Sequence, residues 1–339
     1  MKRLTLTEFA KKIGVGVATV DRVLNDRGGV SPAMENLILQ AARDTGLKRI
    51  LPEKHRPSWQ IEVLLSSNKS FFFEQLAKDF SMLADNLGYR RITLHKTLFS
   101  EASPEKMAKH IEASSKKMDA LIIFAHESPL IYEMLTLCKS RGVPVITLVA
   151  DLPGSDRLCH VGIDQYSAGR TSGFVLGGML PSHGDVVIIS GRTQYAVHRQ
   201  RVDGFISVMQ KFYPKINVRE PIYSQDEREL ISLLLNRTLA SDKDIVGIYN
   251  TGMGNTQVSE ILNDYNLRGK VVYVTHELYN TTRQLLEQRV LTLTIDQNTL
   301  RHAQLAITLA LHYLEMGEQP DEYKSGKVDF MLYTPENYR

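Results

Sequence analysis

The stretch LTLTEFAKKIGVGVATVDRVLNDRGGVSP, residues 4–32, decides the fold of the N-terminus. Apolar residues recur there at helical spacing over 6–13 and again over 17–24. Between these segments Gly14 and Gly16 permit a tight turn, because glycine adopts backbone conformations that other residues avoid. Two short helices joined by a glycine-containing turn form a helix-turn-helix, so the sequence predicts this motif at its N-terminus.

Polar residues mark where the helices of this region begin. Thr5 or Thr7 can cap the first helix, with Glu8 in its first turn. Ser31 can cap a third helix, which we expect to end near Gly46. The residues expected on the apolar faces of the three helices are Leu6, Phe9, Ala10, Ile13, Val17, Val20, Val23, Leu24, Leu37, Ile38, Ala41 and Ala42.

Charge is distributed unevenly along the chain. The 339 residues hold 41 Lys and Arg against 38 Asp and Glu, a net charge of +3. Residues 1–59 contain 11 basic and 6 acidic side chains, whereas the remaining 280 residues contain 30 and 32. A basic head on a nearly neutral body favours a polyanion-binding module joined to a module of another kind. A solvated basic face is the alternative interpretation.

The first 46 residues resemble the DNA-binding head of the LacI/GalR family of transcription regulators. The matching positions are Thr5, 10–15, 18–20, 22–25, Val30 and Ser31. A generic helical hairpin would rarely reproduce these residues at these spacings. We therefore expect residues 1–46 to be a helix-turn-helix domain that binds double-stranded DNA.

The second helix of such a motif enters the major groove, where side chains can distinguish all four base pairs. The resemblance implies that Val17, Ala18 and Arg22 face base edges. Val17 and Ala18 can touch thymine methyl groups, and Arg22 is the candidate for a guanine contact. The resemblance further implies backbone phosphate contacts from Thr5, Thr19, Asn25 and Ser31.

Asp21 departs from the family pattern, because it stands where a small hydroxyl residue usually lies near a phosphate. An anion at this position must point away from DNA or find a basic neighbour. The operator preference of relatives therefore does not carry over to this chain.

The connector, residues 47–60, is basic and contains Pro52 and Pro57. Family members usually place a hinge helix here, which folds on DNA and inserts a leucine into the minor groove. The usual spacing of asparagine, alanine and leucine is absent, and Pro52 would break such a helix unless it fell in the first turn. We expect a plain basic linker, with Leu51 as the only candidate wedge if a hinge helix forms.

From residue 61 onward, short apolar runs alternate with amphipathic segments. The expected strands are 61–65, 92–94, 120–124, 143–149, 161–163, 186–190, 245–249, 271–274 and 291–295. Helical segments include 74–87, 104–115 and 130–141. Repeated β-α units specify parallel sheets covered on both faces, and this length allows two lobes. The predicted fold class is α/β, with an all-α head followed by a two-lobed domain.

The order of these segments resembles the sugar-binding periplasmic-protein fold that forms the effector domain of the same regulator family. The specific points are the aromatic turn at 69–73, GVPVIT at 142–147, VGID at 161–164, Ala168 with Gly169, RVDGF at 201–205 and IDQ at 295–297. The resemblance implies an effector-binding and dimerisation domain over 61–339. Its N-lobe would span about 61–161 plus 296–319, and its C-lobe about 162–295 plus 320–339.

The residues at these strand ends suit a polyhydroxylated ligand. Aromatic faces stack on sugar rings, and carboxylate, amide and guanidinium groups bond hydroxyls. By position, Phe72 or Phe73 would stack, while Asp164, Arg201 and Gln297 would bond the ligand in the cleft. Other roles stay open: the phenylalanines could be core residues, Asp164 could cap a helix, and Arg201 could form a surface ion pair.

Three stretches depart from the usual sugar-binding pattern. Asn250 opens NTGMGN where Asn-Asp is usual, and VA at 149–150 replaces a common Asp-Arg. Glu277, after His276, stands near a usual ligand aspartate. We add Asn250 and Glu277 as candidate effector contacts. We expect the effector to be a carbohydrate or a derivative of one, and its identity stays open.

Enzyme chemistry finds little support in the sequence. The turn GMG at 252–254 follows a strand but lacks the third glycine and the later acidic residue of a dinucleotide site. The scattered histidines show no H-E-x-x-H spacing, and no G-x-S-x-G elbow occurs. Cys138 and Cys159 stand alone and are expected to be buried packing residues. We therefore expect no catalytic residues, no metal and no cofactor.

No segment reaches the roughly 18 to 20 apolar residues of a membrane span, and the charged N-terminus is unlike a signal peptide. We expect a cytoplasmic, homodimeric, sequence-specific transcription regulator, with repression favoured. Its partners would be a pseudo-palindromic operator and a small sugar-like effector, whose binding closes the lobes and changes operator affinity. The alternatives are a solute-binding receptor for transport and an enzyme with an incidental helix-turn-helix.

Overall fold

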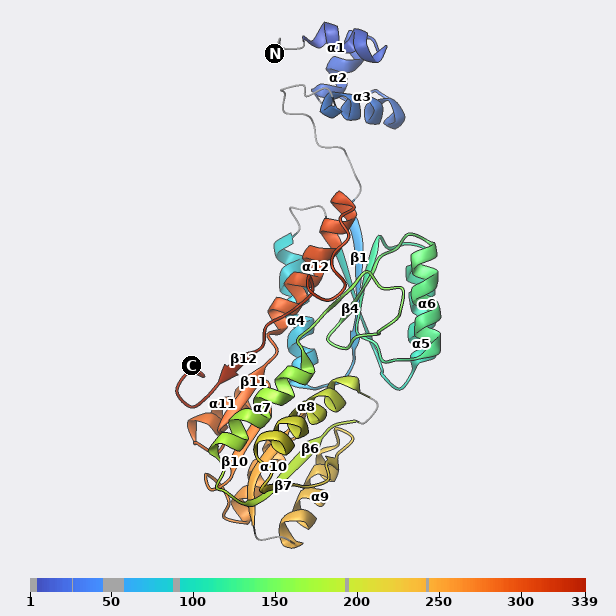
Figure 1. Ribbon diagram of the computed structural model, residues 1–339. Helices are drawn as coiled ribbons and strands as arrows, with labels where there is room; N and C mark the ends of the chain where they lie inside the picture. Colours follow the sequence, from blue (N-terminus) through green and yellow to red (C-terminus); the bar gives the residue numbers. More distant parts are fainter. Residues whose placement is uncertain (1–4, 26, 45–57, 88–91, 193–194, 242–243) are drawn as a thin grey trace. The chain divides into compact units, whose positions relative to one another are not determined.

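The computed structural model describes residues 5–25, 27–44, 58–87, 92–192, 195–241 and 244–339 (Figure 1). Contacts within the chain divide it into two compact units, Met1–Pro57 and Ser58–Arg339. Most of the predicted linker, including Leu51 and any hinge helix, falls outside the described residues. The domain boundaries at 46 and 60 therefore stay predictions.

The described part of the first unit is helical. It consists of α1 (Leu6–Ile13), α2 (Val17–Leu24) and α3 (Pro32–Asp44). Gly14 ends α1 in the left-handed conformation, with φ at 70°, which explains why a glycine opens the turn. The helices enclose a small core of Phe9, Ala10, Val20, Val23, Leu24, Ile38, Leu39 and Ala42.

One predicted core position in α3 is wrong. Leu37 was expected inside but is 50% exposed, whereas Leu39 is fully buried and Ala41 is half-buried. The inner face of α3 is centred between Ile38 and Ala42. At about 100° per residue, Leu39 lies roughly 80° from that centre and Leu37 roughly 120°, which turns Leu37 toward solvent.

Strands β1 to β5 form a parallel sheet in the order β2-β1-β3-β4-β5. Their bounds are Trp59–Ser66, Ile92–Phe99, Ala120–Ile123, Val145–Leu148 and Cys159–Val161. Helices α4 (Phe71–Leu87) and α12 (Thr299–Met316) pack together on one face of the sheet. Helices α5 (Pro104–Ser114) and α6 (Pro129–Ser140) cover the other face (Figure 1).

A second sheet has the order β12-β11-β10-β9-β6-β7, with β8 also paired to β6. The bounds of β6 to β12 are Gly184–Ser190, Ile216–Val218, Ile222–Tyr223, Ile245–Asn250, Val272–His276, Leu293–Asp296 and Met331–Tyr333. The helices are α7 (Gln165–Met179), α8 (Ala196–Phe212), α9 (Arg228–Ser241), α10 (Asn255–Asp264) and α11 (Asn280–Glu287). Pairing is parallel except between β11 and β12.

Alternate residues of β6 show how both faces of the second sheet are covered. Val186 and Ile188 pack into the cluster that contains Phe205 of α8, whereas Val187 and Ile189 pack into the cluster of α9, α10 and α11. A strand buried on both faces has a continuous apolar sequence, which is why the run VVII was readable as a strand. The two-lobed α/β architecture with parallel sheets is as predicted.

The chain passes between the two sheets after β5, after β11 and between α12 and β12. These crossings agree with the predicted lobes, although the lobe boundaries themselves stay predictions.

Cys138 and Cys159 are fully buried, and burial raises the pKa of both thiols, to about 11 and about 12. Among the described residues, no helix is long and apolar enough to cross a membrane.

Candidate functional site

Helix α2 presents the residues expected to contact bases at its solvent-exposed side. Val17, Ala18 and Arg22 are all exposed, and Val17 keeps 41% of its surface accessible. The opposite side of α2 is anchored by Val20 and Val23, which are buried in the core of the head. The structure thus leaves this face available for a groove.

Asp21 has the basic neighbour that the sequence required. Its carboxylate lies 3.1 Å from Arg27 Nη1 and accepts a hydrogen bond from Asn25 Nδ2 at 2.7 Å. The Asn25 amide also donates to the Asp21 carbonyl oxygen at 2.9 Å. The anion is therefore paired within the head, and Asn25 closes the end of α2.

Two of the residues expected at phosphates also cap helices. Thr5 and Glu8 form a capping box, in which Glu8 N donates to Thr5 Oγ1 at 3.3 Å and Thr5 N donates to Glu8 at 2.8 Å. These bonds hold the pKa of Glu8 below its usual value. Ser31 Oγ accepts from Met34 N at 3.4 Å, as expected for the start of α3. Thr19 is half-buried on α2, and Ser31 is exposed.

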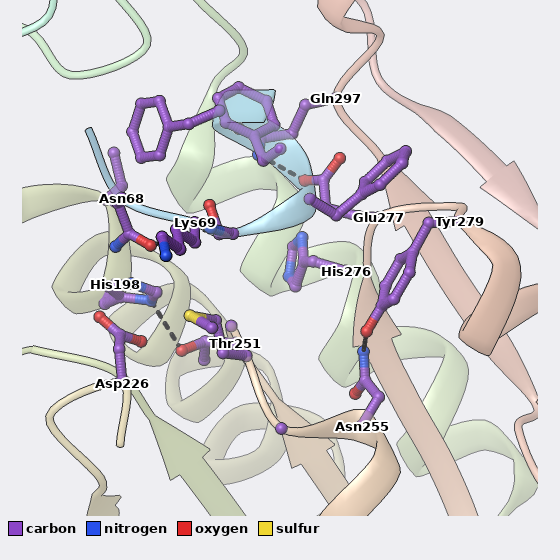
Figure 2. Close-up of a pocket in the computed structure, with 18 of the residues that line it drawn as sticks. Asn68, Lys69, His198, Asp226, Thr251, Asn255, His276, Glu277, Tyr279 and Gln297 are labelled. Atoms are coloured by element: carbon purple, nitrogen blue, oxygen red, sulfur yellow. Dashed lines mark hydrogen bonds between the residues drawn. The ribbon is translucent and has the colours of Figure 1, made fainter. Parts of the chain in front are cut away.

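A cavity of about 310 Å³, the effector cavity, lies in the second unit at the carboxyl ends of the strands. Its lining comes from the loops after β1, β9, β10 and β11 and from the starts of α4 and α8. Figure 2 shows His198 and Asp226 on one side of this space and Glu277 with Gln297 on the other. The volume falls at the lower end of the range for small-molecule sites, about 300 to 1,000 Å³.

Arg201 is the buried cation of the effector cavity. Only 4% of its surface is exposed, yet no carboxylate oxygen lies within 4.0 Å of its guanidinium in the part of the chain that the structure describes. Its Nε donates to Gln165 Oε1 and its Nη1 to the Thr251 carbonyl oxygen, both at 2.7 Å. Burial lowers the pKa of this guanidinium.

Amide side chains connect Arg201 to Glu277. Gln165 Nε2 donates to Gln297 Oε1 at 2.9 Å, and Gln297 Nε2 donates to Glu277 Oε1 at 2.5 Å. Burial and the nearby Asp296 raise the pKa of Glu277 to about 8. Glu277 also has a left-handed backbone, with φ at 70°, so the site holds it in a strained conformation. This chain of hydrogen bonds fixes the relative orientation of the three polar groups that line the cavity, which belong to Arg201, Gln297 and Glu277.

Two buried histidines lining the cavity are held neutral. His198 Nδ1 lies 2.9 Å from Thr251 Oγ1, and burial lowers the pKa of His198 to about 3. His276 Nε2 lies 2.9 Å from the Tyr249 hydroxyl, and burial holds its pKa well below the usual value. The other nitrogen of His276, Nδ1, is buried without a partner among the described residues. A ligand hydroxyl could satisfy that nitrogen.

Aromatic side chains form one wall of the effector cavity. Phe71 stacks on Tyr279 with ring centroids 4.9 Å apart. Phe72 and Phe73 also line the cavity, but they are only 7% and 8% exposed and pack edge-on against each other. These two phenylalanines therefore serve both the core and the wall.

The structure brings together five of the seven predicted effector residues. They are Phe72, Phe73, Arg201, Glu277 and Gln297. Asp164 is exposed outside this lining, and its carboxylate caps α7 by accepting from Ser167 N at 2.8 Å. Asn250 is buried behind the cavity, where its amide donates to Met253 O and Asn255 Oδ1 and so shapes the loop after β9.

Other polar residues of the cavity were not predicted. Gln165, which lies outside the lining and holds Arg201 and Gln297, has no sequence signal beyond its place after the cap of α7. His198 and His276 belong to the scattered histidines whose spacing gave no motif, and no cluster of histidine, cysteine and carboxylate side chains suited to a metal occurs in the described ranges. Asp226 and Tyr195 are brought in by loops whose positions the sequence does not reveal.

Family comparison agrees with this geometry. Residues 61–319 match the model of the periplasmic binding protein domain. The chain belongs to the periplasmic binding protein domain family. Residues 5–48 additionally match the model of bacterial regulatory proteins of the lacI family. The two matches confirm the predicted family resemblance and fold class, a LacI-type helix-turn-helix followed by a two-lobed domain of this family.

Among curated relatives, the ribose operon repressor of Halalkalibacterium halodurans is 30% identical over 123 residues, which cover 35% of this chain and 36% of the relative. The transcriptional regulator DegA of Bacillus subtilis is 23% identical, covering 62% of this chain and 61% of the relative. The chain thus spans less than two thirds of the length of the curated relatives it matches. These names describe regulators rather than enzymes.

Solved structures show the same fold. A glucose-galactose binding protein of Geobacillus stearothermophilus superposes with a TM-score of 0.73 at 17% identity, covering 83% of this chain and 99% of that chain. A solute binding protein of Burkholderia graminis, solved in complex with D-arabinose, gives a TM-score of 0.75 at 21% identity, covering 84% and 98%. At these identities the likeness concerns the fold of the family.

Proposed function

We propose that the protein is a sequence-specific DNA-binding transcription regulator controlled by a small ligand bound between its lobes. The observation that carries this proposal is the combination, in one chain, of an exposed recognition helix and a cavity lined by a buried cation. Val17, Ala18 and Arg22 supply the face for bases, and Arg201 supplies the cation. An account as a binding protein alone leaves the exposed face of α2 without a role.

The effector that suits the cavity is a carbohydrate or a derivative of one. Gln297, neutral His276 and Glu277 offer donors and acceptors for hydroxyls, and Phe71 with Tyr279 offers an apolar wall. The names of relatives support this class, because they include a ribose operon repressor and a ribose import binding protein. Repression is the favoured direction of control for the same reason.

Two further features complete the proposal. A LacI-type head reads a half-site, so two copies of the chain would bind a pseudo-palindromic operator as a homodimer. Such a protein acts where the chromosome is, which places it in the cytoplasm. The N-lobe, 61–161 with 296–319, and the C-lobe, 162–295 with 320–339, would close on the effector.

A solute-binding receptor is the second candidate, because the second unit resembles solute-binding proteins over nearly their whole length. The two candidates differ in one measurable property, which is specific DNA binding. Selection from random double-stranded DNA with the full chain should yield a palindromic motif. Gel-shift titration should then show an operator affinity that changes when D-ribose, D-allose, D-arabinose or D-galactose saturates the protein. DNA binding without sequence preference would contradict the proposal.

A further inference from the structure

A second cavity, of about 370 Å³, lies beside the effector cavity and has no role in the function described so far. We call it the side cavity. It lies at the carboxyl ends of β1, β2 and β3, where the loops 99–104 and 125–128 form most of its wall. Arg192, Tyr195 and Gln225 close it from the side of the second sheet. The side cavity therefore also lies between the lobes.

The two cavities share part of their lining. Phe124 and Tyr195 belong to the walls of both. Tyr195 stacks between His126, whose ring centroid is 4.0 Å away, and His198, at 5.8 Å. His126 lines the side cavity and His198 the effector cavity, so this aromatic stack runs from one space to the other. A ligand that passes the edge of the stack would occupy both cavities.

Polar atoms in this shared region lack partners among the described residues. Tyr195 is only 6% exposed, and its hydroxyl is buried without a hydrogen bond. His126 Nε2 is also unpartnered, because the nearest carboxylate atom, Glu101 Oε2, is 3.6 Å away. That separation is too long for a direct hydrogen bond. Both atoms are therefore free to form a hydrogen bond with a polar group of a ligand.

The chemistry of the side cavity matches a hydroxyl-bearing ring. Glu101, which accepts a hydrogen bond from Ser66, and Glu127 provide carboxylate acceptors. Leu65, Met107 and Ile131 contribute apolar atoms to the same lining. A lining that combines carboxylate acceptors with apolar side chains suits a ring with hydroxyls at its edge and an apolar face. The volumes of the two cavities are similar, so each can hold a ring-sized group.

We propose that the side cavity is a subsite for a second ring, and that the effector is a disaccharide or another glycoside of two ring-sized units joined beside Phe124 and Tyr195. One ring occupies the effector cavity near Arg201, and the second occupies the side cavity near Glu101 and His126. This inference rests on the proposed sugar-binding function, and it adds the size of the ligand.

Calorimetric titration of the full chain tests the subsite. The probes are disaccharides, namely maltose, cellobiose, lactose, melibiose, sucrose and trehalose, and their constituent monosaccharides D-glucose, D-galactose and D-fructose. At least one disaccharide should bind about tenfold or more tightly than either of its constituents, because two or more additional hydrogen bonds supply that ratio. Equal or tighter binding of the constituents overturns the proposal.

Variants then place the second ring. Ala102→Trp fills the side cavity from an exposed turn, and it should reduce the ratio of monosaccharide to disaccharide dissociation constants to about one. His126→Phe keeps an aromatic ring beside Tyr195 but removes Nε2, and it should lower the same ratio about 3- to 10-fold. It serves as the second measurement if the tryptophan variant does not fold.

The matched control is Ala113→Trp, an exposed position of α5 outside both cavities, which should leave the ratio unchanged. A disaccharide preference that survives Ala102→Trp and His126→Phe in folded protein overturns the subsite. If no monosaccharide and no disaccharide binds, the proposed sugar-binding function fails together with the subsite. A protein that binds monosaccharides without a size preference contradicts the subsite alone.

Discussion

At the scale of single residues, Arg201 is a buried charge in the effector cavity that has no carboxylate partner among the described residues. Burying a guanidinium without a carboxylate partner costs several kcal/mol, of which hydrogen bonds return a part. Gln165 and the Thr251 carbonyl provide two such bonds. A ligand hydroxyl or ring oxygen that completes this set gains a charge-assisted hydrogen bond to a buried guanidinium.

Arg201→Ala should weaken effector binding by about 1.5–3 kcal/mol, the value of a hydrogen bond to a charged group. Calorimetric titration of the full chain measures it. The matched control is Arg289→Ala, because Arg289 is exposed and pairs with Glu336 at 2.7 Å on the surface. A surface pair predicts less than about 1 kcal/mol. Equal, small effects of the two variants would remove Arg201 from the site.

Glu277 gives the site a pH signature. Its pKa is raised to about 8 in the folded protein from a usual value of 4.5, so the folded state holds the proton more tightly. Stability from this group is complete below about 4.5 and is lost as pH rises through 8. Glu277→Gln mimics the protonated form. As pH rises from 4.5 to about 8, the melting temperature of the variant should therefore rise relative to that of the native protein.

Thermal unfolding of both proteins across that pH range provides the measurement. The buried histidines His198 and His276 act in the opposite direction, because their lowered pKa values remove stability as pH falls below 6.5. They are present in both proteins, so the difference between the two melting curves isolates Glu277. Parallel curves would show that Glu277 stays ionised in the folded protein.

In the head, Arg22→Ala should weaken specific operator binding by about 1–3 kcal/mol and relax preference at one base pair per half-site. Thr19→Ala and Ser31→Ala should weaken binding more evenly across sequences, because phosphate contacts carry no sequence information. Gel shifts against a set of single-base operator variants separate the two patterns. An Arg22 variant with unchanged preference would contradict its role as the guanine contact.

Site residues that belong to a family motif could be predicted from the sequence, whereas site residues on loops could not. Arg201 and Gln297 were readable because a family motif fixes them on elements that face the cavity. The sequence allowed Asp164 to be either a ligand contact or a helix cap. In the structure it is exposed and caps α7 by accepting a hydrogen bond from Ser167 N. Tyr195 and Asp226 lie on loops, where the path of the chain depends on packing that no local pattern encodes.

At the scale of elements, the crossing of α7 and α8 holds Arg201 in place. Gly169 lies against the backbone of Arg201, and Gly204 lies against the carbonyl oxygen of Tyr166, so that neither position has room for a Cβ atom. Such reciprocal close contact lets two helices approach through their backbones. It gives a physical reason for the glycines in the Ala168-Gly169 and RVDGF motifs.

Gly204→Ala should therefore destabilise the protein by about 1–3 kcal/mol, because the added methyl overlaps the backbone of α7 and separates the helices. It should also weaken effector binding by displacing Arg201. The control is Gly178→Ala on the partner helix α7, where the new Cβ would meet Tyr213 at an ordinary 3.5 Å. Denaturant unfolding compares the two variants, and equal stabilities would show that the crossing tolerates a side chain.

Element prediction succeeded where apolar runs are long and buried and failed where they are short and exposed. Strands β1 and β6 are buried along most of their length, and each contains an uninterrupted apolar run, 63–65 and 186–189. Strands β7, β8 and β12 were missed, because they have two or three residues and lie at or near sheet edges. Their pairing is set by tertiary context rather than by periodicity.

At the scale of the whole molecule, the proposed function requires that the effector cavity and the head be energetically coupled. Coupling between two binding equilibria is reciprocal, so a sugar that changes operator affinity by some factor must have its own affinity changed by operator through the same factor. Typical couplings of about 1–3 kcal/mol correspond to factors of roughly 5 to 150. A ligand with equal affinity for both states shifts nothing.

The sugar that binds the free chain most tightly should accordingly bind the operator-saturated protein with an affinity altered by the factor seen in gel shifts. Calorimetric titration of that sugar into the free chain, into the chain with operator and into the chain with scrambled DNA measures it. Arg22→Ala should remove the effect of operator at concentrations that saturate only the native head, without changing the affinity of the free chain for sugar. If operator and sugar bind independently, the cavity does not control the head, and a solute receptor with a DNA-binding appendage becomes the better description.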